Sequence, residues 1–232
     1  MPTTLVTQCL DKLIPVLTDM INTSLQSGHF AEKWKEALVT PLLKKVGLDQ
    51  MKANLRPVSN LSYVAKLTEL AAVSQLEKHM LKNGLYPLHQ STYRKHHSSE
   101  TALLKVRNNI LLNMNSQQVT LLVLLDFSAA FDTVNHSKLL RVVRSKLGVG
   151  GTVLAWLVFY LSARSQRIIL DGIRSRTYQL NSGVPQGSCL GPLLFNIYVS
   201  GLFDIVNNHA LSWCMPMLMT SKSTFPSVPQ AV

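Results

Sequence analysis

The chain has 232 residues, of which 47% are hydrophobic, enough for the core of one large domain or two small ones. This composition excludes a largely disordered protein, and no apolar run approaches the ~20 residues of a membrane span, so we expect no membrane association. Lysine and arginine outnumber aspartate and glutamate by 23 to 12, and the charge of +11 favours a polyanionic partner such as nucleic acid, although many other proteins are as basic.

The three cysteines indicate a reducing environment. Cys9, Cys189 and Cys214 have neither the spacing of metal ligands nor the even number of a disulfide framework. The N-terminus also lacks the basic and apolar regions of a signal peptide. We therefore expect an intracellular protein, in the cytoplasm, the nucleus or both.

The N-terminal part of the chain predicts a helix followed by a strand. Residues 5–26 have apolar positions at helical spacing, with a bend or break at Pro15 and an end at Gly28. Residues 34–45 have the composition of a strand, which we expect to stop at Pro41 before a basic turn.

The next segment predicts an extended start and two helices. The pair Arg56-Pro57 favours extended backbone. A long helix follows, closed by Asn83-Gly84, whose expected apolar positions are Leu67, Leu70, Val73, Leu76 and Met80. A loop then leads to a helix at about 100–113.

The second half of the chain predicts a central strand, helices and a hairpin. Residues 119–125 are rich in valine and leucine on both faces, as in a strand covered by helices. Helices are expected at about 136–147, stopped by Gly148, and at 151–162. Two strand-like stretches flank Asp171-Gly172, which is a strong hairpin signal. A glycine-rich loop then enters another helix, and the pattern ends near residue 210. The whole predicts an α+β fold with a largely antiparallel sheet and packed helices.

Asp126 stands at the end of the predicted central strand. An ionised aspartate inside a core would cost several kcal/mol, so Asp126 has to reach the surface or a cation. A strand end is a rigid support for a Mg²⁺ ligand, because Mg²⁺ prefers oxygen donors and is often held by one or two carboxylates. The alternative is an aspartate that caps the following turn.

Several stretches, in order along the chain, resemble the reverse transcriptases of non-LTR (LINE-type) retrotransposons. "LLDFSAAFDTVNH" resembles the first catalytic motif, and "SGVPQGSCLGPLLFNIYV" the second palm motif. "WKEALVTPLLKK" and "NLRPVSNLSYVAKLTEL" resemble the two finger motifs. "LHQSTYRKHHSSETALLKV" is similar to the finger-to-palm segment, with Thr92 where glycine is more usual. The resemblance covers roughly residues 5–208.

This resemblance implies the fingers and a partial palm of a right-hand polymerase. The implied division is a fingers-like region at 1–115, a partial palm with both catalytic motifs at 116–208, and an irregular tail at 209–232. It implies RNA-directed DNA polymerisation, in which a nucleotide is transferred to a primer 3′-hydroxyl with Mg²⁺. The implied partners are an RNA template, a DNA primer and deoxynucleotide triphosphates. From this resemblance we expect no thumb domain in this chain.

The first motif implies the reacting residues. Asp126 would be the first metal-binding carboxylate of a two-metal site and thus a catalytic residue. Phe131 falls where the family places an aromatic gate that excludes a 2′-hydroxyl, although most phenylalanines are simply core. We expect Asp132 to order the following turn or to lie at the edge of the metal site.

The remaining motifs imply residues that bind nucleotide or template. Gln186 and Gly187 lie in the loop that contacts the nascent base pair and template in this family, unless the glycines serve only to pack a tight loop. Lys44, with Lys45 beside it, and Arg56 fit finger contacts to triphosphate or template, and Arg94 fits the template backbone. For each of these cations, a solvated surface position is the alternative.

The third catalytic motif of the family, Tyr-x-Asp-Asp, is missing where it is expected. Roughly thirty residues after Gln186 lies Pro216, and no Asp or Glu follows Asp204. Codons for "PMLMT" can give Tyr-Ala-Asp-Asp in another frame, so we expect that the 209–232 tail is frameshifted. We therefore expect little or no polymerisation. The alternatives are a non-catalytic RNA- or DNA-binding module and a retroelement relic without function.

Overall fold

The chain forms two compact units in the computed structural model. The larger comprises Met1–Tyr86 and Phe131–Tyr198, and the smaller Pro87–Ala130 and Val199–Val232. Within them, the structure describes residues 8–43, 45, 47, 49, 55–87, 90–94, 96–122, 127, 129–170 and 172–208. Helices and a sheet are mixed along the chain, which confirms the predicted combination of the two. The division at residues 115 and 208 stays a prediction.

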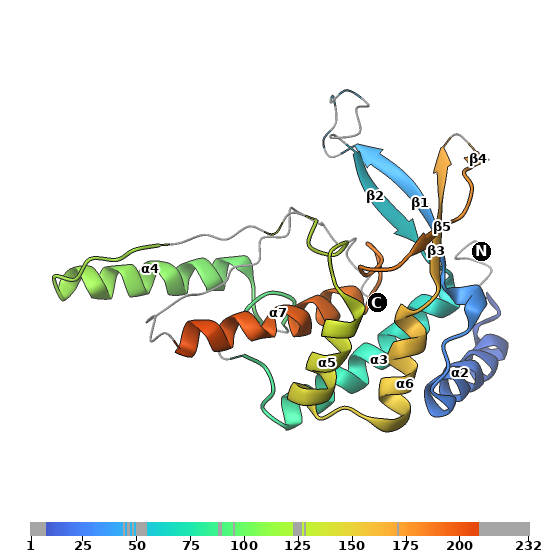
Figure 1. The fold of residues 1–232 in the computed structure, drawn as a ribbon, viewed down its shortest axis with the longest axis horizontal. Helices are drawn as coiled ribbons and strands as arrows, with labels where there is room; N and C mark the ends of the chain where they lie inside the picture. The colour runs from blue at the N-terminus through green and yellow to red at the C-terminus, as the bar shows by residue number, and fades with distance from the viewer. Residues whose placement is uncertain are drawn as a thin grey trace. The chain divides into compact units, whose positions relative to one another are not determined.

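The larger unit contains a small mixed sheet (Figure 1). Its strands are β1 (Glu36–Leu43), β2 (Leu55–Asn60), β3 (Arg164–Leu170), β4 (Ile173–Arg174) and β5 (Tyr178–Leu180). They follow the order β2-β1-β3-β4, and β5 also pairs with β3. The β1–β3 pair is parallel and the other pairs are antiparallel, so the expectation of a largely antiparallel sheet needs this one correction.

Pro41 does not stop the first strand, as we expected from the sequence. β1 continues to Leu43, and Pro41 lies opposite Pro57 of β2 in the antiparallel register. Such a pair fits only where neither residue donates its N–H to the facing strand, because proline has no N–H to give. Because Pro41 faces Pro57 in this register, β1 continues past a proline, a residue that ordinarily ends a strand.

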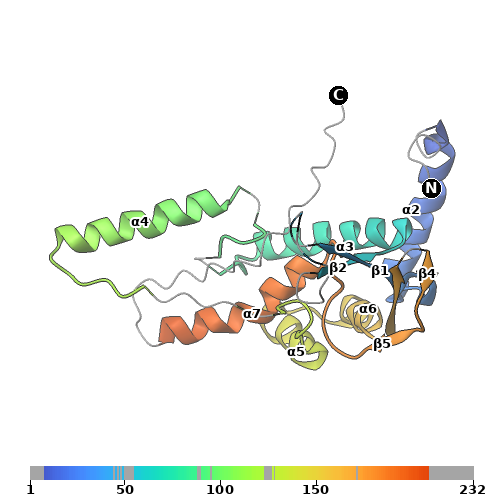
Figure 2. The same cartoon turned by 90° about the horizontal axis from the view of Figure 1, so that it is seen from above.

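Four helices and the start of a fifth pack in this unit. They are α2 (Leu10–Ser27), α3 (Tyr63–Lys82), α5 (His136–Leu147), α6 (Gly151–Leu161) and α7 (Gly191–Asn208). A short 3-10 turn at Glu32–Trp34 lies between α2 and β1. Helix α2 contacts α3 and α6, and α5 lies beside α6 (Figure 2). These helices agree with the sequence predictions, except that α2 is not broken at Pro15, which lies inside it. The left-handed backbone of Gly28 and Gly148 ends α2 and α5 as expected.

The core of the larger unit is built around an aromatic cluster. Phe30 is fully buried and makes edge-to-face contacts with Trp34, Trp156 and Tyr160 at ring distances of 5.2–5.4 Å. Trp156 and Tyr160, one turn apart on α6, stack on each other. The indole Nε1 of Trp156 donates to Ser24 Oγ at 3.0 Å, so the cluster ties α2 to α6.

Helix α3 buries a different face from the one that its apolar spacing predicts. Leu76 and Met80 are buried as expected, but Leu70 is 51% exposed. The neighbouring Thr68 and Glu69 are fully buried instead. The polar groups of these residues are satisfied by hydrogen bonds, which is what allows a polar face to be buried.

The smaller unit contains helix α4 (Ser99–Asn115), which agrees with the predicted helix at 100–113. A capping box formed by Ser98 and Thr101 starts it. The predicted strand at 119–125 is wrong for residues 119–122, which have no strand geometry, and Val119 is 98% exposed. A strand needs a partner for its backbone, and the described residues of this unit contain no other strand. Residues 123–126 lie outside the described part.

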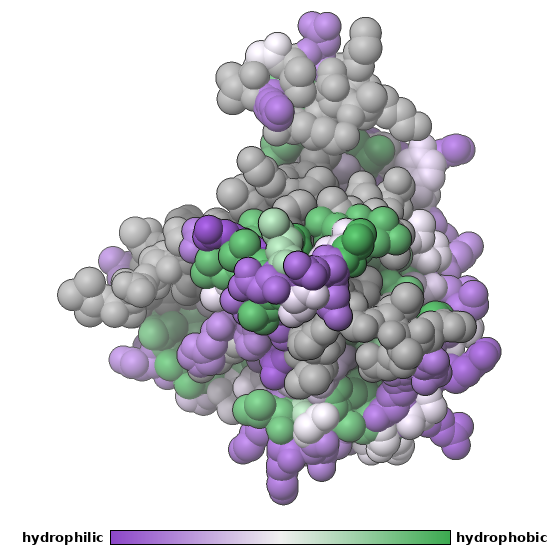
Figure 3. Space-filling view, turned by 90° about the vertical axis from the view of Figure 1, so that its left-hand side faces the viewer, coloured by the Kyte–Doolittle hydropathy of each residue, from purple (hydrophilic) through white to green (hydrophobic). Residues whose placement is uncertain are grey.

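Other hydrophobic side chains are exposed at the surface, among hydrophilic ones (Figure 3). On α4 they include Leu103, Leu104, Leu111, Leu112 and Met114. Within the described ranges, no helix is long and apolar enough to cross a membrane.

Removing the central ring of the aromatic cluster should destabilise the larger unit. We expect Phe30→Ala to lower the free energy of unfolding by about 3–5 kcal/mol, because it leaves a cavity among three rings. Urea unfolding followed by tryptophan fluorescence measures this. The control is Leu81→Ala, at an exposed position on α3, which should change it by less than about 0.5 kcal/mol. Equal effects of the two changes would contradict the packing described.

Candidate functional site

Two segments with motif residues meet in the larger unit, a turn at 131–134 and a loop at 182–187. The backbone N–H of Gly183 donates to the carbonyl oxygen of Val134, and that of Val184 donates to the carbonyl oxygen of Phe131, both at 2.8 Å. Almost fifty residues of chain separate the two segments. Two backbone bonds in register therefore fix them independently of their side chains.

Gly183 allows this close approach. Its φ is +83°, and a Cβ there would lie 2.9 Å from the Cα and the carbonyl oxygen of Asp132 and from the carbonyl oxygen of Phe131. All three are backbone atoms, which cannot rotate aside as a flexible side chain can. Glycine is thus required both by the conformation and by the space.

The same loop also contacts the end of strand β2. The N–H of Ser59 donates to the carbonyl oxygen of Gln186 at 2.9 Å. The next residue, Gly187, has φ +104°, and a Cβ there would lie 2.8 Å from the Ser59 carbonyl oxygen. Gly187 is exposed, so its backbone remains open to a ligand on the outer side. The loop is held between the turn and β2.

Asp132 and Gln186 form a side-chain pair at this junction. Partial burial raises the pKa of the Asp132 carboxyl, and its hydrogen bond with the Gln186 side chain opposes that rise. The Ser182 hydroxyl donates to the Asp132 carbonyl oxygen at 3.2 Å. Asp132 thus contacts the 182–187 loop through its side chain and its backbone, and its expected roles in the following turn and at the edge of a metal site stay predictions.

His136, in the first turn of α5, adds a contact that the sequence analysis did not name. Its Nε2 lies 2.8 Å from the carbonyl oxygen of Gly183. A carbonyl can only accept, so Nε2 has to bear the hydrogen. The imidazole therefore connects the loop to the start of α5.

Phe131 is half-buried at the edge of this junction. Its ring lies 5.4 Å from the ring of Phe195 on α7, with a tilt of 48°. The ring thus has a packed side and an exposed part. This geometry is compatible with both readings of Phe131, and the gate stays a prediction.

A buried polar network lies beneath the loop. The Glu69 carboxylate on α3 lies within hydrogen-bonding distance of the Tyr160 hydroxyl (3.0 Å), the Ser188 hydroxyl (2.9 Å) and the backbone N–H of Cys189 (2.7 Å). Glu69 is fully buried. Burial raises the pKa of its carboxyl, although these hydrogen bonds and the charge of Arg164 lower it.

Arg164 is the buried cation of this network. It is 1% exposed; Nη1 donates to the Tyr160 carbonyl oxygen at 2.9 Å, and the guanidinium lies 4.8 Å from the Tyr160 ring centroid. Burial, followed by the charge of Glu69, raises the pKa of the Tyr160 hydroxyl. Tyr160 therefore lies between the buried acid and the buried base.

Of the residues that the sequence analysis selected, the structure brings together Phe131, Gln186 and Gly187. Arg94 belongs to the smaller unit, where Nη1 donates to the Gln90 carbonyl oxygen at 3.5 Å. Asp126 and Lys44 lie outside the described residues. The backbone of Arg56 pairs with Leu42 in the sheet, but its side chain is not among those described.

The described residues do not by themselves form a site for the implied Mg²⁺. They contain no group of three or more His, Cys, Asp or Glu side chains that could hold a metal ion. The one carboxylate at the junction, Asp132, is already bonded to Gln186. Asp126, the Mg²⁺ ligand that the resemblance implies, lies outside the described residues, so its part in such a site stays a prediction.

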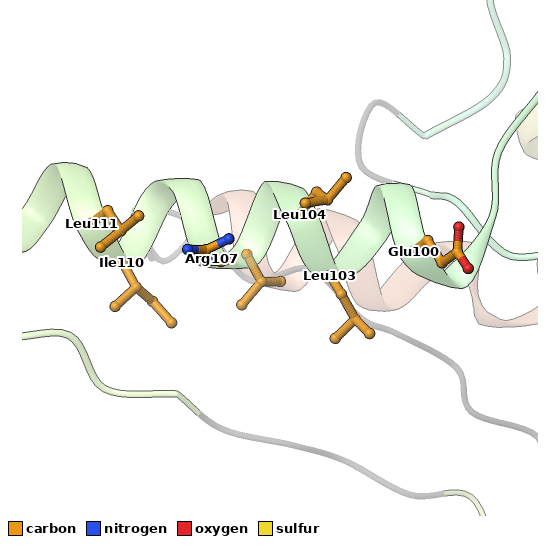
Figure 4. A pocket seen from close by; sticks show the side chains of 7 residues that line it. Glu100, Leu103, Leu104, Arg107, Ile110 and Leu111 are labelled. Carbon is orange, nitrogen blue, oxygen red and sulfur yellow. The ribbon is translucent and has the colours of Figure 1, made fainter.

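A pocket of about 520 Å³ lies elsewhere, along α4 (Figure 4). Its lining is mainly apolar and includes Leu103, Leu104, Ile110 and Leu111, with Glu100 and Arg107. All of these belong to a single helix. We interpret it as the uncovered side of α4, because a binding pocket normally has walls from several elements.

The network residues Glu69, Tyr160, Arg164 and Ser188 were missed by the sequence analysis. Glu69 follows Thr68 and precedes Leu70 in a helix with mixed polarity, so its position alone does not indicate burial. A usable signal for Ser188 was present, since it directly follows the Pro-Gln-Gly stretch. We selected only the residues within that stretch.

Comparison with known proteins identifies the class of this fold and site. Residues 43–222 match the family described as reverse transcriptase (RNA-dependent DNA polymerase), and this range includes both the turn and the loop. The chain belongs to this reverse transcriptase family. The resemblance found in the motifs is therefore confirmed.

The relatives that it matches come from LINE-type transposons. The chain is 28% identical over 196 residues to the probable RNA-directed DNA polymerase from transposon BS of Drosophila melanogaster, covering 82% of this chain and 21% of that protein. It is 27% identical to the RNA-directed DNA polymerase from mobile element jockey of the same species, covering 83% and 21%. It is also 27% identical to the Pol polyprotein from the type-1 retrotransposable element R2 of Popillia japonica, covering 79% and 25%. The chain thus spans about a fifth to a quarter of the length of these relatives.

Adding a methyl group at Gly183 should test the contact between turn and loop. We expect Gly183→Ala to lower the free energy of unfolding by about 1–3 kcal/mol more than Gly172→Ala, because its Cβ meets three backbone atoms. Gly172 is a matched control, with φ +81° and no atom within 4 Å of a Cβ. Urea unfolding measures both, and equal losses would contradict the close approach.

Glu69 should make stability depend on pH in a defined direction. Since its pKa in the folded chain lies above the ordinary 4.5, the folded state binds its proton more tightly than the unfolded chain. This contribution is complete below pH 4.5 and is lost as the pH rises through the raised pKa. We expect the free energy of unfolding of the wild type, relative to Glu69→Gln, to fall with rising pH over that window.

Urea titrations at a series of pH values measure this difference. Gln75→Ala, at an exposed position on the same helix, is the control and should leave the pH slope of the wild type unchanged. A wild type that gains stability relative to Glu69→Gln as the pH rises from 4.5 would show a lowered pKa and contradict the network described.

Proposed function

We propose that this chain is the fingers and part of the palm of an RNA-directed DNA polymerase, and that the 131–132 turn and the 186–187 loop face the nascent base pair. The fingers would comprise residues 1–115 and the partial palm 116–208. The observation that carries the proposal is that two motifs far apart in the sequence form one junction, joined by backbone hydrogen bonds. The family membership supports the interpretation of this junction as a polymerase feature.

The geometry suits a nucleic-acid ligand. Gln186 offers an amide oriented by Asp132, and Gly187 offers exposed backbone without a side chain in the way. Amide and backbone groups read and position nucleotides through hydrogen bonds. The charge of +11 favours a polyanion in general. The partners proposed are an RNA template, a DNA primer and deoxynucleotide triphosphates, in the cytoplasm or nucleus.

Residues outside this junction complete the proposal. Asp126 would be the carboxylate that holds Mg²⁺, which in such enzymes activates the primer hydroxyl and binds the triphosphate. Phe131 would be the gate against a 2′-hydroxyl. Lys44 and Arg56 would contact the triphosphate or template, and Arg94 the template backbone.

We further propose that the chain with this sequence does not polymerise, or does so barely. No Asp or Glu follows Asp204, so the carboxylates that the family places after the Pro-Gln-Gly loop have no counterpart in that part of the sequence. The same observation favours a second function, a non-catalytic module that binds RNA or DNA through its positive charge.

Binding of a primed RNA template tests the proposal. By fluorescence anisotropy, we expect affinity to fall at least about tenfold between ~50 mM and ~200 mM salt. Gln186→Ala should weaken binding by about threefold or more through the lost hydrogen bonds, whereas Gln75→Ala, at an exposed position on α3, should not. Asp126→Ala should not weaken binding, since phosphate contacts dominate affinity.

Primer extension on the same template with Mg²⁺ distinguishes the two functions. The expected result is no extension by the wild type. Extension that Asp126→Ala abolishes would overturn the proposed inactivity and establish the enzyme. A chain that does not bind the primed template at low salt would overturn both functions.

A further inference from the structure

The hydrogen atoms available to the buried network are too few if Glu69 is ionised. Three oxygen-to-oxygen contacts close a ring: Glu69 with Tyr160 at 3.0 Å, Tyr160 with Ser188 at 2.8 Å, and Ser188 with Glu69 at 2.9 Å. Each contact of this length needs a hydrogen between its oxygens. The two hydroxyl groups bring two, and a carboxylate brings none.

A protonated Glu69 supplies the third hydrogen. Its Oε2 already accepts from the Cys189 N–H at 2.7 Å, so Oε2 acts as the carbonyl oxygen and Oε1 bears the proton. Glu69 then donates to Tyr160, Tyr160 donates to Ser188, and Ser188 donates to Glu69. The Ser188 oxygen has two lone pairs, so the Tyr160 hydrogen shares them with the two backbone N–H groups that also reach this oxygen, at 3.1 and 2.9 Å. Each contact in the ring has one hydrogen.

The surroundings favour the neutral acid. Glu69 is fully buried, and ionising a buried carboxyl without a paired cation is costly. Arg164 is buried nearby, but its Nη1 is bonded to the Tyr160 carbonyl oxygen, and no ion pair among the described residues includes Glu69. The Arg164 guanidinium lies 4.8 Å from the Tyr160 ring centroid, and its Nε and Nη2 are buried without a hydrogen-bond partner among the described residues. Its charge lowers the pKa of the Glu69 carboxyl by less than burial raises it.

The ring is attached to the residues that follow Gln186 and Gly187. The Ser188 hydroxyl accepts from the N–H groups of Leu190 (3.1 Å) and Gly191 (2.9 Å), and so forms the start of α7. The Ser188 N–H donates to the Pro185 carbonyl oxygen at 3.0 Å. A displacement of the ring would therefore move both ends of the loop that contains Gln186.

We propose that Glu69 is a positioning residue, which holds the 185–191 loop as a neutral carboxylic acid in a ring of three hydrogen bonds with Tyr160 and Ser188. Its importance for nucleic-acid binding rests on the proposed function of that loop. The ring itself does not depend on it.

Two substitutions at Glu69 separate the neutral acid from a carboxylate. A glutamine in the same place donates from its amide nitrogen to Tyr160 and accepts from Ser188 and Cys189 with its oxygen, as the neutral acid does. Alanine removes both groups and leaves the Cys189 N–H without a partner. Thr68→Val is the matched control, because Thr68 is equally buried but bonds only within α3, to Val64.

Hydrogen–deuterium exchange of the full chain measures the loop directly. We expect Glu69→Ala to speed exchange of the amides at 188–191 by about tenfold or more. Exchange in β1 should not change. Glu69→Gln should stay within about threefold of the wild type, and Thr68→Val should not alter this segment. Infrared spectra at neutral pH should show the C=O band of a protonated carboxyl in the wild type and not in Glu69→Gln.

Contrary results would overturn the proposal in distinct ways. If Glu69→Gln loosens the loop as much as Glu69→Ala, or if the infrared band is absent, a carboxylate holds the loop. If Glu69→Ala leaves the loop protected, Glu69 does not position it. Should Glu69→Ala fail to fold, Tyr160→Phe breaks the ring while keeping the aromatic packing, and unchanged exchange at 188–191 then refutes the ring.

Template binding separates this inference from the proposed function. If Glu69→Ala loosens the loop while neither it nor Gln186→Ala weakens binding of primed RNA, the positioning role stands and the proposed function of the loop fails. If Gln186→Ala weakens binding and Glu69→Ala changes neither binding nor exchange, the proposed function of the loop stands and the positioning role of Glu69 fails.

Discussion

The larger unit depends on the direct backbone contact of three segments: the turn at 131–134, the loop at 182–187, and the end of β2 at Ser59. At Gly183 and Gly187 the approach is so close that a Cβ would overlap backbone atoms of the facing segment. Backbone hydrogen bonds, rather than adaptable side chains, set the distances. Asp132, Gln186 and Phe131 consequently stand in fixed positions relative to one another, which is the condition for a precise binding site.

This rigidity is supported by an unusual use of buried polar groups. Glu69, Arg164 and Tyr160 are all inaccessible, and the acid and the base are linked through the tyrosine rather than paired directly. Such a network contributes little net stability compared with apolar residues of the same volume. Its directional hydrogen bonds, however, admit few alternative arrangements of the loop. An apolar replacement would pack as well and specify the loop less.

Local signals predicted the elements of this fold well and its buried polar groups poorly. The C-terminal end of α5 and the β3–β4 hairpin followed from Gly148 and from residues 171–172, because glycine acts through the conformation of its own backbone. Pro41 misled the prediction because its tolerance depends on Pro57, in another strand. Glu69 could not be found from helical spacing, since its partners Tyr160 and Ser188 lie 91 and 119 residues away. Motif resemblance selected Phe131 and Gln186, but only the structure shows that a turn, a loop and a strand end hold them.

The facing prolines have a consequence for the free side of the sheet. Among the described strands β2 is the outermost, and Pro57 and Ser59, two residues apart, direct their nitrogens to the same outer side. Proline has no hydrogen to offer there, and that of Ser59 is already taken by Gln186. A strand of another molecule that pairs with this edge would find no free backbone N–H donor at either position. The edge is therefore protected here against edge-to-edge aggregation.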